Sequence, residues 1–240
     1  MARFEDKVAF VTGGGRGIGK ATAARFASEG AKVAAADLAF DDDVQTLRLE
    51  TDVTNREAVE AAVARTVEEL GGLDILVTCA GIIRDNLVHK LTDDDWEAVL
   101  ATHLRGTFLA AQAAQRHMVE QGGGKMVLIS STSALGNRGQ LNYSAAKAGI
   151  QGMTKTLAIE LGRFNVNVNC VAPGFVSSAM TRETAERIGI PFEDFQRLAA
   201  EQTPLGRIGE PEDIAGVIAF LCSEDASYVS GQVIYVRGGP

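Results

Sequence analysis

The sequence has no apolar run near the roughly 20 residues that span a bilayer, and its polar start does not resemble a secretory signal. It also has no basic excess, since 23 Lys and Arg against 31 Asp and Glu give a net charge of −8. A chain this acidic has no bulk attraction to nucleic acid or anionic lipid. We therefore expect a cytoplasmic protein with no nucleic acid and no membrane as partner.

Cysteine is scarce as well. The three thiols, Cys79, Cys170 and Cys222, are odd in number, lie in apolar stretches and lack the spacing of metal ligands. We expect reduced core thiols rather than disulfides. His89 and His117 have no neighbours of metal-ligand type, since the nearest carboxylates resemble the acidic first turn of a helix. The sequence therefore implies no metal.

Short β-branched and apolar runs alternate with longer amphipathic stretches, which is the pattern of βαβ units. Several runs are hydrophobic throughout, as expected for strands covered on both faces. We predict strands at 7–12, 32–37, 46–52, 74–78, 125–130, 166–171 and 232–236, and helices at 17–29, 56–69, 93–120, 142–163 and 212–221. No repeat or long linker divides the chain. The prediction is a single α/β domain over residues 1–240, with a seven-stranded parallel sheet and helices on both faces.

Residues 177–209 form the least regular region, in which Pro191 and Pro204 flank a short amphipathic piece at 192–200. An insert of this length often forms a lid over a site. Apolar side chains within this region and just before it supply surface either for a substrate or for the core of the lid itself. They are Phe175, Met180, Ile188, Phe192 and Phe195.

The first predicted strand runs into a glycine-rich turn, Thr12-Gly-Gly-Gly-Arg-Gly-Ile-Gly19, and then into an alanine-rich helix. Gly13 permits a tight turn, Gly17 lets the backbone approach a pyrophosphate, and Gly19 lets helix and strand pack closely. The helix N-terminus supplies free N–H groups and partial positive charge. A purely structural glycine turn is the weaker alternative. The pattern predicts a dinucleotide site in a Rossmann-type, doubly wound sheet.

Asp37 ends the second predicted strand, 18 residues after Gly19. A carboxylate there accepts both ribose hydroxyls of NAD and repels the 2′-phosphate of NADP. Arg16 in the glycine turn favours the opposite choice, because a cation can neutralise that phosphate. No basic residue follows in Leu38-Ala39-Phe40 to help it. We expect NAD as cofactor, with NADP as the alternative.

A second cluster, Tyr143-Ser-Ala-Ala-Lys147, opens a predicted helix and places a phenol and an ammonium one turn apart on one face. Lowering a phenol pKa by about 3 units takes roughly 4 kcal/mol of preferential phenolate stabilisation, which a nearby cation and the positively charged nicotinamide of an oxidised cofactor can supply. Upstream, the strand that ends in Ser130 and Ser131 delivers hydroxyls to the same edge of the sheet. Together with the nucleotide turn, these residues indicate catalysis.

These motifs resemble the short-chain dehydrogenase/reductase family over essentially the whole chain, in particular its 3-oxoacyl-[acyl-carrier-protein] reductase-like branch. The matching pieces are Thr12 to Gly19, Asp52-Val53, Ala80-Gly81, Ser131, Tyr143 with Lys147, Pro173-Gly174 and the closing Gly231-Gln-Val-Ile-Tyr-Val-Arg-Gly-Gly239.

The resemblance implies hydride transfer at nicotinamide C4. Tyr143 would be the general acid/base, Ser131 would orient the carbonyl or alcohol, and Lys147 would lower the Tyr143 pKa and hold the nicotinamide ribose. Asp52 and Val53 would meet the adenine. The expected cofactor-binding residues are Gly13, Arg16, Gly17, Ile18, Gly19, Asp37, Leu38, Asp52, Val53, Cys79, Ala80, Gly81, Tyr143, Lys147, Pro173, Gly174, Val176 and Ser178.

The sequence departs from the family pattern at three places. Cys79 replaces an Asn beside the cofactor, and His103, in His-Leu-Arg-Gly, replaces the Asn that is the family's fourth catalytic residue. That position mainly contributes a main-chain carbonyl to a water near the lysine, so we expect His103 to substitute for it; a merely structural histidine is the alternative. Ser131 precedes Tyr143 by one residue fewer than usual, so counting from the strand favours Ser131 and counting from Tyr143 favours Ser130.

We expect an NAD(H)-dependent oxidoreductase that interconverts a secondary alcohol and a ketone, with a 3-oxoacyl or 3-hydroxyacyl thioester as substrate. The His-Leu-Arg-Gly run also resembles enzymes that act on 3-hydroxyacyl-CoA, which favours oxidation. Alternatives are a sugar, polyol, steroid or aromatic alcohol as substrate, or a non-catalytic dinucleotide-binding protein. The resemblance also implies a homotetramer joined through helices 93–120 and 142–163.

Overall fold

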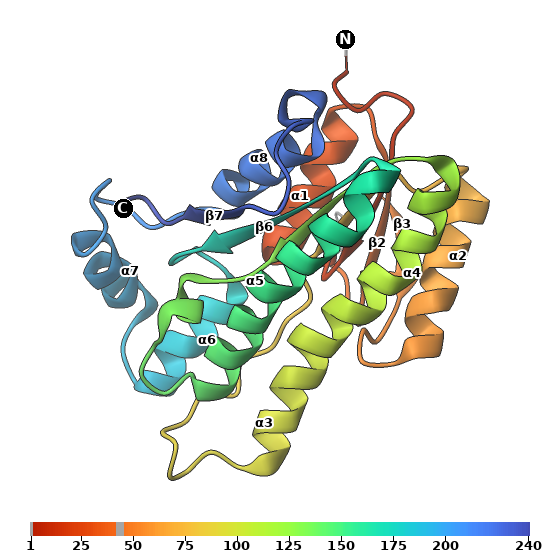
Figure 1. Cartoon of the computed structure of the whole chain (residues 1–240). Helices are drawn as coiled ribbons and strands as arrows, with labels where there is room; N and C mark the ends of the chain where they lie inside the picture. Colours follow the sequence, from red (N-terminus) through yellow and green to blue (C-terminus); the bar gives the residue numbers. More distant parts are fainter. Residues whose placement is uncertain (1, 42–45) are drawn as a thin grey trace.

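A computed structural model describes residues 2–41 and 46–240, and its centre is one parallel β-sheet (Figure 1). The strands are β1 (Val8–Thr12), β2 (Lys32–Asp37), β3 (Leu47–Glu50), β4 (Ile75–Thr78), β5 (Gly124–Ile129), β6 (Val166–Pro173) and β7 (Val233–Val236). They lie in the order β3-β2-β1-β4-β5-β6-β7. The predicted seven-stranded doubly wound sheet is therefore confirmed, although β3 is shorter than the predicted 46–52.

The strand order reverses beside β1, which pairs with β2 on one side and β4 on the other. Thr12, at the end of β1, lies opposite both Ala36 and Thr78. The carboxyl ends of these strands therefore meet at one edge of the sheet. Such a switch point is where ligands bind in open parallel sheets.

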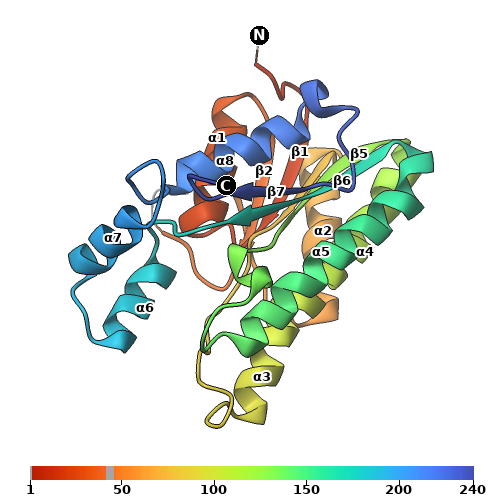
Figure 2. The ribbon, with the colours of Figure 1, turned by 60° about the vertical axis from the view of Figure 1, so that its left-hand side comes forward.

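Helices cover both faces of the sheet (Figure 2). On one face lie α1 (Gly17–Ser28) and α8 (Pro211–Cys222), and on the other lie α2 (Arg56–Leu70), α4 (Gly106–Gln121) and α5 (Leu141–Leu161). Phe10 packs in the core under α2, α4 and α5, whereas its neighbour Val11 packs in the core under α1 and α8. Both side chains are fully buried, and all five residues of β1 are buried, as expected for a central strand covered on both faces.

The helix predicted over 93–120 is helical along its length but not continuous. It divides into α3 (Asp93–Leu100), a π-helical turn at Ala101–Arg105, and α4. The periodicity of apolar residues does not reveal such a turn, because one inserted residue shifts the pattern by only part of a turn. His103 lies within the turn, and π-turns inside helices are frequent at functional sites.

The segment 177–209 contains two helices, α6 (Ala179–Ile188) and α7 (Phe192–Glu201), where only a short piece at 192–200 was predicted. The start of α6 is fixed by a capping box, in which Ser178 and Thr181 exchange side-chain and backbone hydrogen bonds. Both helices lie beside the carboxyl edge of the sheet, outside the two covering layers (Figure 2). Among the described residues, no helix has the length and apolar character needed to cross a membrane.

Candidate active site

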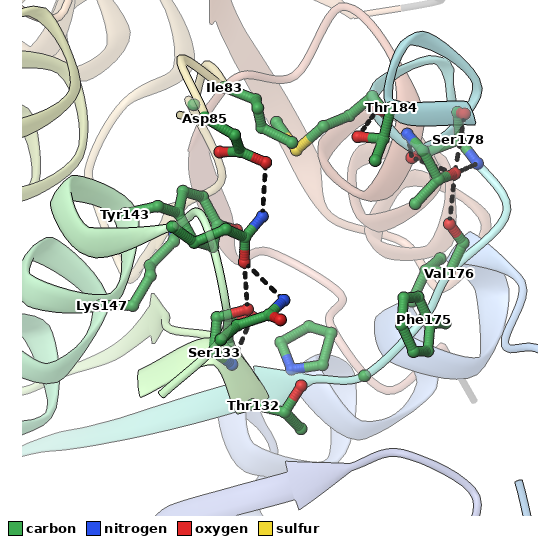
Figure 3. A pocket seen from close by; sticks show the side chains of 18 of the residues that line it. Ile83, Asp85, Thr132, Ser133, Tyr143, Lys147, Phe175, Val176, Ser178 and Thr184 are labelled. Atoms are coloured by element: carbon green, nitrogen blue, oxygen red, sulfur yellow. Dashed lines mark hydrogen bonds between the residues drawn. The ribbon is translucent and has the colours of Figure 1, made fainter. Parts of the chain in front are cut away.

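A cavity of about 560 Å³ opens at the carboxyl edge of the sheet, beyond the ends of β4, β5 and β6. Ser131, Tyr143 and Lys147 line one side of the cavity, and the π-turn contributes His103. The opposite wall comes from the segment after β6 and from α6 (Figure 3). The structure therefore brings the four predicted catalytic residues to one space.

Tyr143 and Lys147 lie one turn apart near the start of α5, as the sequence pattern predicts. The Lys147 Nζ atom is 5.4 Å from the centroid of the Tyr143 ring and donates to the Ile129 carbonyl oxygen at 2.7 Å. Lys147 is 4% exposed, and its burial lowers the pKa of the amine to about 8. The ammonium is thus held rigidly beside the phenol by the end of β5.

The Tyr143 phenol is harder to ionise than a free tyrosine. Loss of hydration raises its pKa to about 12; the Ser131 hydroxyl opposes this rise, and the negative charge of Asp85 adds to it. We expected Lys147 to lower the pKa of Tyr143, but the side chains of the protein raise it instead. The reason is that burial outweighs the hydrogen bond with the Ser131 hydroxyl. Tyr143 is therefore protonated at neutral pH.

The two strand-end serines have different contacts. Ser130 is 1% exposed, donates to the Lys147 carbonyl oxygen at 2.8 Å and accepts from Gln151 at 3.2 Å. Ser131 accepts from the Ser133 amide at 3.1 Å and interacts with the Tyr143 phenol. Ser130 thus joins β5 to α5, whereas Ser131 is the serine whose hydroxyl interacts with the Tyr143 phenol.

His103 is 1% exposed and packs edge-on against the Tyr143 ring, with the ring centroids 5.0 Å apart. Its Nε2 atom lies 2.7 Å from the Ile82 carbonyl oxygen and 3.1 Å from the Ile82 amide, and burial lowers the pKa of the imidazole to about 3. The ring is therefore neutral. Any side chain at Gly81 would collide with it, so Gly81 and His103 fit as a pair.

The glycine turn between β1 and α1 has the shape that a pyrophosphate requires. Gly17 has φ of +55°, and a Cβ there would meet only Ser178 at 4.0 Å, so this backbone is open to a ligand. A Cβ at Gly19 would collide with the Gly13 carbonyl oxygen, which shows the close approach of helix and strand. Within the described residues, no side chain caps α1 and no acid lies in its first turn. These N–H groups fit a bound dinucleotide.

Asp37 lies beside this turn at the end of β2. Its Oδ2 atom accepts from the Gly15 amide at 3.0 Å and its Oδ1 atom accepts from the Leu38 amide at 2.8 Å, so the carboxylate is fixed in place. Leu38 is 67% exposed and Arg16 is exposed at the mouth of the turn. The Asp37 carboxylate, which is predicted to meet the adenosine ribose, is therefore held by backbone hydrogen bonds, whereas the Arg16 side chain is exposed to solvent.

The other predicted cofactor residues separate into two groups. Those that line the catalytic cavity are Ile18, Cys79, Gly81, Pro173, Gly174, Val176 and Ser178. Ala80 lies against Gly13 on the nucleotide side, while the Val53 side chain packs against Gly106 in the core. The carboxylate of Asp52 accepts from the Thr54 amide and hydroxyl, both at 2.8 Å. Burial raises the pKa of the Cys79 thiol to about 12, as for an inert packing thiol.

Four of the five apolar residues named for the lid line the cavity: Phe175, Met180, Ile188 and Phe195. Phe192 does not; it stacks on Phe195 and lies under the Arg182 guanidinium, 4.2 Å from its ring centroid. Phe175 and Phe195 meet edge-to-face with centroids 5.7 Å apart. The wall opposite Tyr143 is therefore largely apolar and partly aromatic.

Sequence reasoning missed Asp85, Ser133 and Gln140, which also line the cavity. Asp85 lies in the loop after β4, and its Oδ2 atom accepts from Gln140 at 2.8 Å and from Arg187 at 3.0 Å. The position of Asp85 just beyond the carboxyl end of a central strand was the available signal. Among the residues described, no group of three His, Cys, Asp or Glu is arranged to hold a metal.

The comparisons with known proteins cover the whole chain. A family model described as enoyl-(acyl carrier protein) reductase matches residues 13–240. The chain is 44% identical to the short-chain reductase protein NovJ of Streptomyces niveus, and the match covers 100% of this chain and 95% of the relative. It is 43% identical to the (2S)-[(R)-hydroxy(phenyl)methyl]succinyl-CoA dehydrogenase subunit BbsD of Thauera aromatica, over 98% and 96% of the two chains.

It is also 41% identical to the 3-oxoacyl-[acyl-carrier-protein] reductase FabG of Thermotoga maritima, over 99% of this chain and 98% of the relative. Among solved structures, the ligand-free aldohexose dehydrogenase of Thermoplasma acidophilum superposes with a TM-score of 0.95 at 30% identity, covering 99% and 95% of the chains. The chain therefore belongs to the short-chain dehydrogenase/reductase family and is an oxidoreductase that acts on CH–OH donors, interconverting a secondary alcohol and a ketone with a nicotinamide cofactor.

Proposed function

We propose that the protein is an NAD(H)-dependent reductase or dehydrogenase of 3-oxoacyl and 3-hydroxyacyl thioesters. The observation that carries this proposal is the Tyr143, Ser131 and Lys147 cluster, which faces an apolar wall across one cavity. Such a wall suits an acyl chain better than a sugar, whose hydroxyls need polar partners. The printed names of two relatives, a CoA-thioester dehydrogenase and an acyl-carrier reductase, support the same substrate class.

In this proposal Tyr143 transfers the proton and Ser131 orients the reacting oxygen. When bound, the nicotinamide supplies or accepts the hydride at its C4 atom. Lys147 presents its ammonium to the ribose and stabilises charge on the phenol, and the Ile129 carbonyl fixes its direction. His103 is too weakly basic to carry a proton at neutral pH, so it acts by packing against Tyr143 and through its main chain.

NAD(H) is the cofactor favoured by the charges beside the ribose. The Asp37 carboxylate is fixed by two backbone N–H groups and would repel a 2′-phosphate. Arg16 is the only cation in the turn itself and is exposed to water, where ion pairs contribute little.

The segment 177–209 acts in this proposal as a lid over the cavity of its own subunit. The protein itself is proposed to be a cytoplasmic homotetramer of single-domain subunits. The two ends of the lid segment are joined, since the amides of Ser177 and Gly209 donate to the carbonyl oxygens of Gly209 and Phe175. A segment held at its base can move as one unit. Phe108 on α4 and Ile159 on α5, 42% and 82% exposed, offer apolar surface for contacts between subunits. Light scattering that gives a monomer mass would refute the tetramer.

The test is turnover of a panel of ketones, namely 3-oxoacyl thioesters, a steroid ketone and an aromatic ketone, with oxidation of an aldohexose run in parallel. We expect the thioesters to give the highest kcat/KM with NADH, and Tyr143→Phe to abolish turnover while NADH still binds. Turnover of the aldohexose alone would refute the substrate class. Tight NADH binding without turnover of any compound would identify a non-catalytic binding protein.

A further inference from the structure

Between residues 176 and 206, a single side-chain hydrogen bond connects the lid to other described parts of the chain. It joins the Arg187 Nη2 atom, in the last turn of α6, to the Asp85 Oδ2 atom at 3.0 Å, and the two residues are 102 positions apart. The other side-chain hydrogen bonds of this stretch stay within it, as those of Thr181 and Arg197 do. The ion pair of Arg187 and Asp85 is therefore a distinct point of attachment for the lid.

Few other contacts hold α6 against the rest of the subunit. Of its ten residues only Ala185 is buried, and its main neighbour among the helices and strands is α7, which belongs to the same lid. About 12 Å of helix separates Arg187 from Ala179, which follows the base of the lid. A helix with so little buried surface moves away at low cost in free energy. An ion pair at its far end can therefore decide its position.

The Asp85 side of the ion pair is fixed by hydrogen bonds. The Asp85 Oδ2 atom also accepts from the Gln140 amide at 2.8 Å, and the Gln140 Oε1 atom accepts from the Ser133 hydroxyl at 2.8 Å (Figure 3). The Ser133 amide donates in turn to the Ser131 hydroxyl oxygen at 3.1 Å. Continuous hydrogen bonds thus connect α6 to the serine that interacts with the Tyr143 phenol.

The exposure of this ion pair suits a contact that forms and breaks. The Arg187 and Asp85 side chains are 39% and 14% exposed, so water and salt weaken their attraction. The Asp85 Oδ1 atom is buried and has no partner among the described residues, which offsets part of the stabilisation. Both side chains line the cavity, so their separation would widen it.

We propose that Arg187 is a positioning residue, whose ion pair with Asp85 is a latch that holds α6 over the bound substrate and breaks when the product leaves. The inference rests on the proposed lid function of residues 177–209. A latched lid excludes water and keeps the ketone beside Ser131 and Tyr143. Arg187 needs no contact with the substrate in this role. Its loss should therefore weaken substrate binding rather than the chemical step.

Amide hydrogen exchange of the full-length protein tests the latch without substrate. Arg187→Gln should raise exchange in α6 by about two- to fivefold, the effect of losing a partly exposed ion pair, and Arg187→Lys should restore most of the protection. The matched control is Arg197→Gln, which removes the same group from the same lid, since Arg197 pairs with Asp194 and Glu201 inside α7. Unchanged α6 exchange in Arg187→Gln, or an equal rise in the control, would overturn the latch.

A double variant tests whether the two residues act as a pair. Asp85→Asn removes the charge that Arg187 meets and should also raise α6 exchange. Combined with Arg187→Gln, it should add little, because both changes remove one interaction. Fully additive effects would contradict the latch.

Steady-state kinetics with a 3-oxoacyl thioester connect the latch to turnover. Arg187→Gln should raise KM for the thioester by about the same two- to fivefold without lowering kcat, whereas Arg197→Gln should change neither. Faster α6 exchange with an unchanged KM would overturn the role in substrate binding. If no thioester is turned over while α6 exchange responds as expected, the proposed substrate class fails and the latch stands.

Discussion

Two adjacent serines allow catalysis to be separated from stability. Both serines border the cavity, but the Ser131 hydroxyl interacts with the Tyr143 phenol, whereas the Ser130 hydroxyl donates to the Lys147 carbonyl oxygen. Ser131→Ala and Ser130→Ala remove the same atom from neighbouring positions. We therefore expect the first to reduce kcat and the second to reduce stability.

The magnitudes follow from what each hydroxyl contacts. Loss of one donor to the oxygen on which charge develops costs about 100- to 1,000-fold in kcat, so Ser131→Ala should fall in that range with little change in KM. Ser130→Ala leaves the Lys147 carbonyl without its side-chain donor, which costs about 1 kcal/mol. For a chain of this length that corresponds to a Tm lower by about 2–4 °C.

Steady-state kinetics, followed through the absorbance of NADH with a 3-oxoacyl thioester, and thermal unfolding of the same samples measure the two effects. The dissociation constant for NADH serves as control, since neither serine is expected to contact the dinucleotide. If Ser130→Ala lost as much kcat as Ser131→Ala with an unchanged Tm, the assignment of the two serines would be wrong. Counting residues back from Tyr143 would then have been the better guide.

Three further predictions follow from charges in the structure. Asp37→Ser removes the anion beside the adenosine ribose, and the ratio of NADH to NADPH affinity, measured by titration, should fall by at least about tenfold; an unchanged ratio would exclude Asp37 as the determinant. The pKa of Lys147 is about 8 in the folded protein against an ordinary 10.5, so the unfolded chain binds more protons between these values. The free energy of unfolding should therefore rise with pH between about 8 and 10.5. This rise should be absent from Lys147→Met. Urea unfolding at the lower and upper pH of this window tests the prediction, and an equal pH dependence in the two proteins would contradict it. Because Tyr143 must lose its proton to act as a base, kcat for alcohol oxidation should rise from neutral to alkaline pH while kcat for ketone reduction does not, and parallel pH profiles in the two directions would count against this assignment.

Most of the fold could be predicted because local sequence and tertiary structure agree. The central strands are β-branched or apolar runs with both faces buried, as Phe10 and Val11 illustrate, and the crossover helices carry apolar stripes. The π-turn at Ala101–Arg105 could not be predicted, since one extra residue in a helix leaves no compositional mark. Helix α6 was missed because its start depends on the Ser178 capping box rather than on an apolar stripe.

The candidate site could be predicted where chain geometry alone fixes it. Tyr143 and Lys147 are four residues apart on one helix, and the glycine turn joins adjacent elements, so their neighbours are determined locally. Asp85, Gln140 and Arg187 come from three separate segments and meet only when α6 folds over the cavity. A sequence pattern therefore cannot predict that these three residues meet.

Burial decides whether the Tyr143 phenol is protonated, and a sequence motif gives no information about burial. Withdrawal from water, together with the negative charge of Asp85, raises the pKa of Tyr143 to about 12, while Lys147 is bonded to the Ile129 carbonyl. A phenol in this state is a proton donor at neutral pH, which is what a ketone needs as its oxygen gains negative charge. To accept a proton from an alcohol, Tyr143 needs additional positive charge nearby, and an oxidised nicotinamide carries it whereas a reduced one does not. In the proposed mechanism, the chain's own residues therefore set Tyr143 as an acid for reduction, and its use as a base follows from the cofactor form that oxidation requires.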